Sequence, residues 1–341
     1  MIAFTSKPTY TLAPADPLKH VRYTLGMVLG VDDFDQQFAY LDGHRDWGLR
    51  DLVGYGTASG LAVQRENTTT GPRIVVTAGT AVSPRGQLIR VSPAQCAPLG
   101  EWLAAHQGEV NQHMAALGSP PSDALSLFVT LCYADCPSDL VPIPGEPCRS
   151  EDDVMAPSRL ADDFRLELRL DPPAQREEDA VRDFVAWLKQ VELMTSGPVA
   201  SLAEFEQAIR DAAHLLASPP GAPGTDFMFG SPPASLRIHR DDACEFLRAA
   251  WRIWVTELRP LWRPDFLGAR CGCHGDCGDH EAPEDCLLLA ELSVPIVDSA
   301  GQWVVDSSAD VTIDERRRPI LVHLRMLQEW AACGWCCGDT P

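Results

Sequence analysis

Cysteine and histidine residues gather in one short stretch of the chain, CGCHGDCGDHEAPEDC. The candidate metal ligands in it are Cys271, Cys273, Cys277 and Cys286, with His274 and His280 as alternates. Tetrahedral zinc prefers thiolate and imidazole ligands, and a glycine-rich loop can fold around the ion. The spacing differs from that of paired CxxC knuckles, so reduced loop thiols and a disulfide stay open as alternatives. Four protein ligands would leave no open coordination position, which predicts a structural zinc site.

Two further cysteine groups lie outside this stretch. They are Cys132, Cys136 and Cys148 around a long loop, and Cys333, Cys336 and Cys337 near the C-terminal end. The first group has no histidine nearby and is a weaker metal signal. The second contains a CxxC after an expected helix, whereas a thioredoxin-like site needs the motif at a helix N-terminus after a strand. Redox catalysis is therefore disfavoured, although this tail could complete a metal site.

Other catalytic patterns fail on spacing. The tripeptide HRD occurs at 44–46 and 239–241, but the positions where a kinase loop would carry asparagine hold Asp51 and Phe246. Both tripeptides are better interpreted as charged helix faces. No GxSxG, HExxH or Walker motif occurs. The sequence therefore predicts a protein that is not an enzyme. A metal-dependent hydrolase that uses the Cys/His-rich loop with an open coordination site is the alternative.

The composition of the chain limits which class of protein it can be and which partners it can bind. The chain has 341 residues, 45% of them hydrophobic, and 28 basic against 48 acidic residues give a formal net charge of −20. Such a length predicts two globular domains, and such a charge repels nucleic acid and anionic lipid headgroups. No N-terminal signal or membrane-length apolar run is evident, so we expect a cytoplasmic protein. Its twelve cysteines then favour metal over disulfides.

The residues from Tyr23 to Arg90 form the clearest part of the pattern. Asp33 can cap a helix with Gln36, and the side chains on one side of that helix are Phe34, Phe38, Leu41 and Leu52. Gly54, Gly56 and Gly60 then end the helix. Short apolar runs at 61–63, 74–76 and 88–91 predict a β-meander beneath it. We expect an N-terminal docking module over residues 1–120.

Residues 121–341 are expected to form a second domain, giving an α+β protein. Its mixed sheet should contain strands at 125–133, 164–170 and 287–297, with a loop of about thirty residues between the first two. Helical periodicity over about 176–260 predicts a helical insertion, and Ser201 with Glu204 predicts a capping box within it. The Cys-rich loop at 271–286 and a C-terminal helix from about Pro319 to Trp330 complete the domain.

The N-terminal run resembles proteins of phage tail-like contractile injection systems and their genomic neighbours. The similarity is carried by GMVLGVDDFDQQFAYLDGHRDWGLRDLVGYGTASGLAV and VVTAGTAVSPRGQLIRV, with weaker likeness in the later parts of the chain. The matching positions are Gly30, Asp32, Asp33, Phe34, Tyr40, Gly54, Gly56, Gly60, Leu61, Gly79 and Gly86. The resemblance implies a structural, baseplate-associated component without a defining enzymatic motif. It also implies other particle proteins as partners, within a symmetric assembly.

Overall fold

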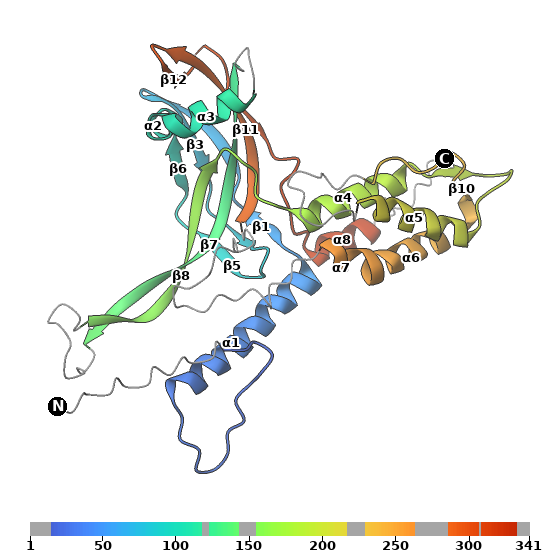
Figure 1. Ribbon diagram of the computed structural model, residues 1–341, viewed down its shortest axis with the longest axis horizontal. Helices are drawn as coiled ribbons and strands as arrows, with labels where there is room; N and C mark the ends of the chain where they lie inside the picture. Colours follow the sequence, from blue (N-terminus) through green and yellow to red (C-terminus); the bar gives the residue numbers. More distant parts are fainter. Residues whose placement is uncertain are drawn as a thin grey trace, which may run out of the picture. The chain divides into compact units, whose positions relative to one another are not determined.

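The structure is a computed structural model that describes residues 15–117, 123–142, 155–216, 229–262, 286–306 and 308–332. The chain divides into two compact units (Figure 1). We call residues 1–173 with 266–341 the sheet unit, and residues 174–265 the helical unit. Each has its own hydrophobic core. Helices and antiparallel sheets together confirm the α+β class.

Two small antiparallel sheets replace the expected meander. One contains β1 (Gly56–Gly60), β4 (Gly79–Val82) and β5 (Leu88–Val91) in that order, and the other contains β2 (Val63–Thr68), β3 (Gly71–Val76) and β6 (Gln95–Pro98). The chain leaves the first sheet after Gly60, where Gly60 and Leu61 both have positive φ. A Cβ on Gly60 would lie 2.2 Å from the carbonyl oxygen of Ala78, so the corner requires glycine.

A larger antiparallel sheet contains the strands expected in the second half of the chain. Its strands are β7 (Ala124–Pro142), β8 (Met155–Arg169), β11 (Cys286–Ser299), β12 (Gln302–Val305) and β13 (Thr312–Asp314). The order is β12-β11-β7-β8, and β13 also pairs with β11. The side chains of Leu125, Leu127 and Leu131 are fully buried, as the apolar run predicts for a central strand.

Strands β7 and β8 extend far beyond the sheet as a two-stranded arm (Figure 1). Their pairing continues from Ala134 opposite Asp163 to Pro142 opposite Met155. The expectation of a thirty-residue loop was therefore wrong for most of this stretch, which is strand. Residues 143–154 lie outside the described part of the chain.

The boundary expected near residue 120 does not separate two cores. Residues before it, such as Ile74 and Leu99, and residues after it, such as Leu127 and Leu289, belong to one buried cluster. Two helices, α2 (Leu99–Ala105) and α3 (Gln107–Leu117), contribute Leu103, Val110 and Met114 to the same core.

The helical unit coincides with the helical insertion expected at about 176–260. Its elements are α4 (Arg176–Lys189), β9 (Glu192–Met194), α5 (Leu202–Leu216), β10 (Arg237–His239), η3 (Arg240–Asp242), α6 (Ala243–Ile253), η4 (Trp254–Leu258) and α7 (Arg259–Trp262). Phe184, Trp187, Phe205 and Trp254 dominate its core. The ring of Phe184 stacks on that of Trp254, with centroids 5.0 Å apart.

The C-terminal segment of the described chain returns to the N-terminal sheets. The Thr57 amide donates to the Pro319 carbonyl at 2.9 Å, and the Leu321 amide donates to the Thr57 carbonyl at 2.8 Å. Pro319 lies in this extended segment, and the last described helix, α8, spans Leu324–Ala332. The helix start expected at Pro319 was therefore too early, because Pro319 and Leu321 pair their backbones with β1.

Candidate interaction surface

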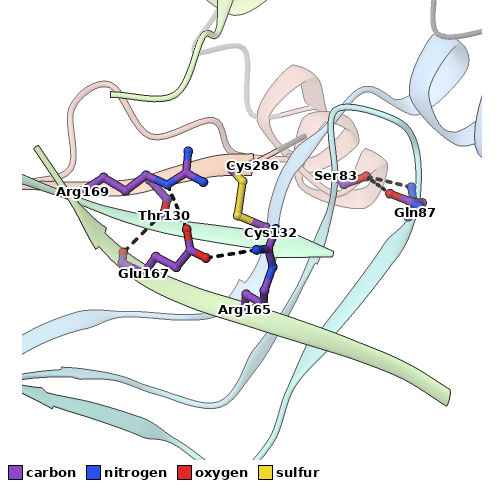
Figure 2. Close-up of a disulfide and its surroundings, with 8 residues drawn as sticks. All are labelled: Ser83, Gln87, Thr130, Cys132, Arg165, Glu167, Arg169 and Cys286. Atoms are coloured by element: carbon purple, nitrogen blue, oxygen red, sulfur yellow. Dashed lines mark hydrogen bonds and ion pairs between the residues drawn. A yellow bond between two sulfur atoms is a disulfide. The ribbon is translucent and has the colours of Figure 1, made fainter. Parts of the chain in front are cut away.

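Most of the predicted zinc ligands lie outside the described residues. These are Cys271, Cys273, Cys277, His274 and His280, so the zinc site stays a prediction. Cys286 is described, and its sulfur is bonded to that of Cys132 at 2.01 Å (Figure 2). In this disulfide form Cys286 has no thiolate to offer a metal, which corrects its assignment as a ligand. The described residues contain no group of three or more His, Cys, Asp or Glu placed to hold a metal ion.

The disulfide follows from the strand register. Cys286 on β11 is the direct partner of Cys132 on β7, and their Cα atoms are 4.2 Å apart. Both residues are buried in the sheet. Of the cysteines grouped with Cys132 in the sequence, Cys136 is an exposed free thiol, and Cys148 lies outside the described residues. Cys333, Cys336 and Cys337 also lie outside them.

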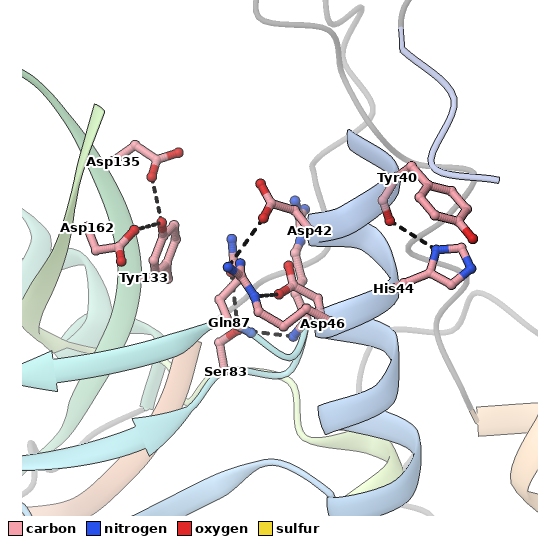
Figure 3. A network of polar contacts seen from close by, with 11 residues as sticks. Tyr40, Asp42, His44, Asp46, Ser83, Gln87, Tyr133, Asp135 and Asp162 are labelled. Carbon is pink, nitrogen blue, oxygen red and sulfur yellow. Dashed lines mark hydrogen bonds and ion pairs between the residues drawn. The ribbon is translucent and has the colours of Figure 1, made fainter. Parts of the chain in front are cut away.

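The two HRD tripeptides have local structural roles. The Arg45 guanidinium lies 3.3 Å from Asp42 and 3.0 Å from Asp46. The His44 ring bonds the Tyr40 carbonyl at 3.0 Å (Figure 3). In the helical unit, the Asp241 amide donates to Nδ1 of His239 at 3.3 Å, which caps η3. The interpretation as a charged helix surface is confirmed for residues 44–46 on α1. It was wrong for residues 239–241, because His239 ends β10 and the next two residues belong to the short turn η3.

A cavity of about 740 Å³ lies in the sheet unit between β6 and β8. Arg165, Glu167 and Arg169 line one side of it, and they form a ladder in which Glu167 lies 3.3 Å from Arg165 and 2.9 Å from Arg169 (Figure 2). His106 also lines the cavity, and its Nδ1 bonds the Trp102 carbonyl at 2.8 Å. Glu167 is therefore paired with both arginines in this wall of the cavity.

An exposed apolar surface of the sheet unit lies on α1 (Val31–Gly48), which continues into the π-helical turn η1 (Leu49–Val53). We call Val31, Phe34, Phe38 and Leu41 the apolar seam; their exposed fractions range from 51 to 73%. The sequence expectation of a helix here is confirmed, but this stripe does not pack on the hairpins as expected. Among the residues of α1 only Gly43 is buried. Contiguous exposed apolar surface of this kind marks interaction sites.

The segment before α1 lies along a different face of the helix. The Gln36 amide donates to the Asp16 carbonyl at 2.6 Å, and the Val21 amide donates to Gln37 at 3.3 Å. The segment itself adds Leu25 and Val28, which are almost completely exposed. The preceding segment thus enlarges the apolar surface instead of covering it.

The C-terminal half of α1 is held by the turn between β4 and β5. A Cβ on Gly86 would lie only 1.9 Å from the Asp46 carbonyl oxygen, and Gly86 has φ of +96°. Ser83 shapes this turn, because its amide donates to the Gln87 carbonyl at 2.8 Å and its carbonyl accepts from Gly86 at 2.8 Å. The glycine recognised in the sequence pattern is therefore required by close backbone approach.

The β7–β8 arm is a second exposed surface. Leu140, Val141, Met155 and Leu160 are exposed along it. At its base the Tyr133 hydroxyl lies 2.6 Å from Asp135 and 2.7 Å from Asp162 (Figure 3). Burial and these hydrogen bonds raise the pKa of the Tyr133 phenol. Sequence reasoning missed the arm because its residues show no two-residue alternation.

Comparison with known proteins adds little to this description. No family model and no curated protein matches the sequence. A solved structure titled "Crystal structure of TssK" matches with 14% identity and a TM-score of 0.20, over 72% of this chain and 57% of that chain. A TM-score of that size does not establish a shared fold. Among the described residues, no helix is long and apolar enough to span a membrane.

Taken together, the described surfaces suit macromolecular contact. An apolar helix face and a two-stranded arm offer broad surfaces, and interfaces between proteins use such surfaces. A catalytic site would instead concentrate unpaired acids, bases or nucleophiles in a concave pocket. Arg165, Glu167 and Arg169 in the described cavity are paired with one another. The candidate interaction surfaces of the described chain are therefore α1 and the β7–β8 arm.

Proposed function

We propose that this protein is a non-enzymatic structural or assembly component of a phage tail-like contractile injection particle, associated with its baseplate. The single observation that carries the proposal is the solvent-exposed apolar seam on α1. The likeness of residues 23–90 to the injection-system pattern supplies the kind of assembly. In this proposal the protein acts through protein–protein interfaces and is assembled into its particle in the cytoplasm.

Exposure of the apolar seam is energetically unfavourable for an isolated chain. Burial of a phenylalanine or leucine side chain contributes about 1.5–3 kcal/mol relative to leaving it in water. Phe34, Phe38 and Leu41 are all more than half exposed. A binding partner that covers them therefore gains stabilisation that the chain alone does not realise.

The arm supports the proposal independently of α1. An isolated two-stranded hairpin is marginally stable in water. The distal pairs of the arm, such as Leu140 with Pro157, have only each other as strand partners among the described residues. Contact with a neighbouring subunit would stabilise these strands and cover Leu140 and Leu160.

The charge of the chain restricts its neighbours. A formal net charge of −20 favours basic protein surfaces and disfavours nucleic acid. We therefore propose other particle proteins as the partners. The hydrolase alternative concerns residues outside the described part of the chain and stays a prediction.

The test is purification of contractile particles from the cells that encode this chain. Quantitative mass spectrometry of intact particles, with the chain located by electron cryomicroscopy, should find it in a fixed ratio to the baseplate proteins. Its absence from every purified particle would overturn the proposal.

A further inference from the structure

The cavity of the sheet unit lies between two strand edges that no described strand covers. In the described part of the chain, β6 pairs with β3 alone, and β8 pairs with β7 alone at the end of the larger sheet. Residues of both β6 and β8 line the cavity. The outer edge of such a strand offers a row of backbone donors and acceptors to which another strand can be added. The cavity therefore has walls suited to an extended peptide.

The backbone of β8 is open toward the cavity at two leucines. The Glu167 carbonyl accepts from the Thr130 hydroxyl at 3.5 Å, so it points toward β7 (Figure 2). Backbone groups alternate in direction along an antiparallel pair, so the amides and carbonyls of Leu166 and Leu168 point away from β7. In agreement, the Phe164 amide donates to the carboxylate of the residue before it, at 2.8 Å. Water or an added strand must satisfy these outward groups.

The apolar face of β8 is only partly covered. Leu127 and Leu131 on the neighbouring strand β7 are fully buried, whereas Leu166 and Leu168 are partly buried and line the cavity. Trp102 is also partly buried and lines the cavity. Side chains of an added strand point to the same face at every second residue. A segment with apolar residues at alternate positions would therefore cover this face.

The opposite face of β8 indicates the charge of the segment. Arg165 and Arg169 share the carboxylate of Glu167, and no other acidic residue is among the described residues that line the cavity. The Arg165 side chain is 60% exposed. Opposite charges on neighbouring strands stabilise their pairing, so a carboxylate on the polar face of the segment suits Arg165. The overall charge of the chain favours a partner with a basic surface, whereas this wall favours one acidic side chain within the bound segment.

We propose that this cavity binds an extended segment of another protein, which is added as a strand to the outer edge of β8. The segment alternates apolar and polar residues and carries aspartate or glutamate beside Arg165. Backbone hydrogen bonds to Leu166 and Leu168 supply affinity, and the apolar side chains that enter the cavity supply specificity. The site is separate from the apolar seam on α1, and it does not depend on the proposed function.

The test selects peptides from a displayed library of random sequences, each about twelve residues long, on the full chain. Cys96 on β6 is an exposed free thiol that lines the cavity, so Cys96→Trp should obstruct it, and Cys96→Ser is the matched control. Enriched peptides should alternate apolar and polar residues, include an acid, and bind Cys96→Ser roughly tenfold more tightly than Cys96→Trp. Arg165→Gln should weaken their binding roughly threefold. A library without such peptides, or equal binding to both Cys96 variants, would overturn the inference.

Amide hydrogen exchange of the full chain distinguishes strand addition from other ways of filling the cavity. A selected peptide, made synthetically, should slow exchange of the Leu166 and Leu168 amides roughly tenfold or more at saturation, because it accepts their hydrogen bonds. The amide of Leu160, on the arm and outside the cavity, is the control and should not change. Peptides that fill the cavity and leave both leucine amides unprotected would overturn strand addition.

Discussion

Cys132 and Cys286 lie opposite each other on β7 and β11, although 154 residues separate them in the sequence. Their disulfide joins two buried central strands of the sheet unit. Closing so long a loop restricts the unfolded chain, and removal of such a bond costs typically about 2–5 kcal/mol. We predict that Cys132→Ala with Cys286→Ala lowers the free energy of unfolding by about this amount, measured by urea denaturation.

The control for this prediction is the reductant. Dithiothreitol should lower the free energy of unfolding of the wild-type protein and leave that of the double variant unchanged. Cys96→Ala removes an exposed free thiol and should behave as wild type. Alkylation of both Cys132 and Cys286 in unreduced, denatured wild type would show that the disulfide is not formed. The pair would then consist of two thiols.

Gly86 is predicted to be essential for holding α1. A side chain there would meet the Asp46 carbonyl at 1.9 Å in a backbone conformation that favours glycine, so Gly86→Ala should strain or break this contact. We expect a loss of about 1–3 kcal/mol and faster amide hydrogen exchange in the last turns of α1. Gly100→Ala is the control, because a Cβ on Gly100 meets nothing within 4 Å. Unchanged exchange in Gly86→Ala would contradict the close approach.

Arg318 is predicted to hold the C-terminal segment on the first sheet. Its buried guanidinium donates to the Thr57 hydroxyl at 2.9 Å, to Glu315 at 2.7 Å and to the Gly60 carbonyl at 3.2 Å. Arg318→Met leaves these acceptors without their donor, which should cost about 3 kcal/mol in thermal or urea unfolding. Arg316→Met, which breaks an exposed pair with Asp314, should change stability little. Equal effects of the two variants would count against the role of Arg318.

Tyr133 is predicted to ionise above the ordinary pH range for a tyrosine. Burial, followed by the hydrogen bonds to Asp135 and Asp162, raises its pKa. Because the pKa of Tyr133 is higher in the folded than in the unfolded state, its protonated phenol contributes fully to the free energy of unfolding below the unfolded value of about 10. That contribution is lost as the pH rises from this value through the folded-state pKa. In an ultraviolet titration of the folded protein, one of the five tyrosines should therefore ionise late. Tyr133→Phe should remove that late step, and its persistence in the variant would contradict the assignment.

Local patterns in the sequence predicted local structure well. Alternation in FRLELRL predicted the part of β8 that lies in the sheet, and the Ser201–Glu204 capping box is present, with the Ser201 amide donating to Glu204 at 2.7 Å. Gly56 and Gly60, two glycines of the recognised N-terminal pattern, both have positive φ. A valine at either position should therefore hinder folding, since a Cβ on Gly56 would lie 2.8 Å from the backbone of Pro319.

Long-range features could not be predicted from the same patterns. The Cys132–Cys286 pair depends on the register of two strands, which no local spacing reports. Periodicity placed Phe34 and Phe38 on one face of α1, but it does not state whether the same chain covers that face. The arm was missed because hydrogen bonding to β7, rather than an apolar face, makes residues 155–163 a strand.

The central claim is that the chain assembles into a particle through the apolar seam of α1. The most direct measurement is the amount of tagged chain in purified contractile particles, compared among wild type, Phe34→Ser with Phe38→Ser, and Leu247→Ser. Leu247 is an exposed apolar residue of the helical unit and serves as the matched control. The account predicts that wild type and Leu247→Ser are incorporated equally, whereas the double variant folds but is lost from particles. Equal incorporation of the double variant, or absence of wild type from every particle, would contradict it.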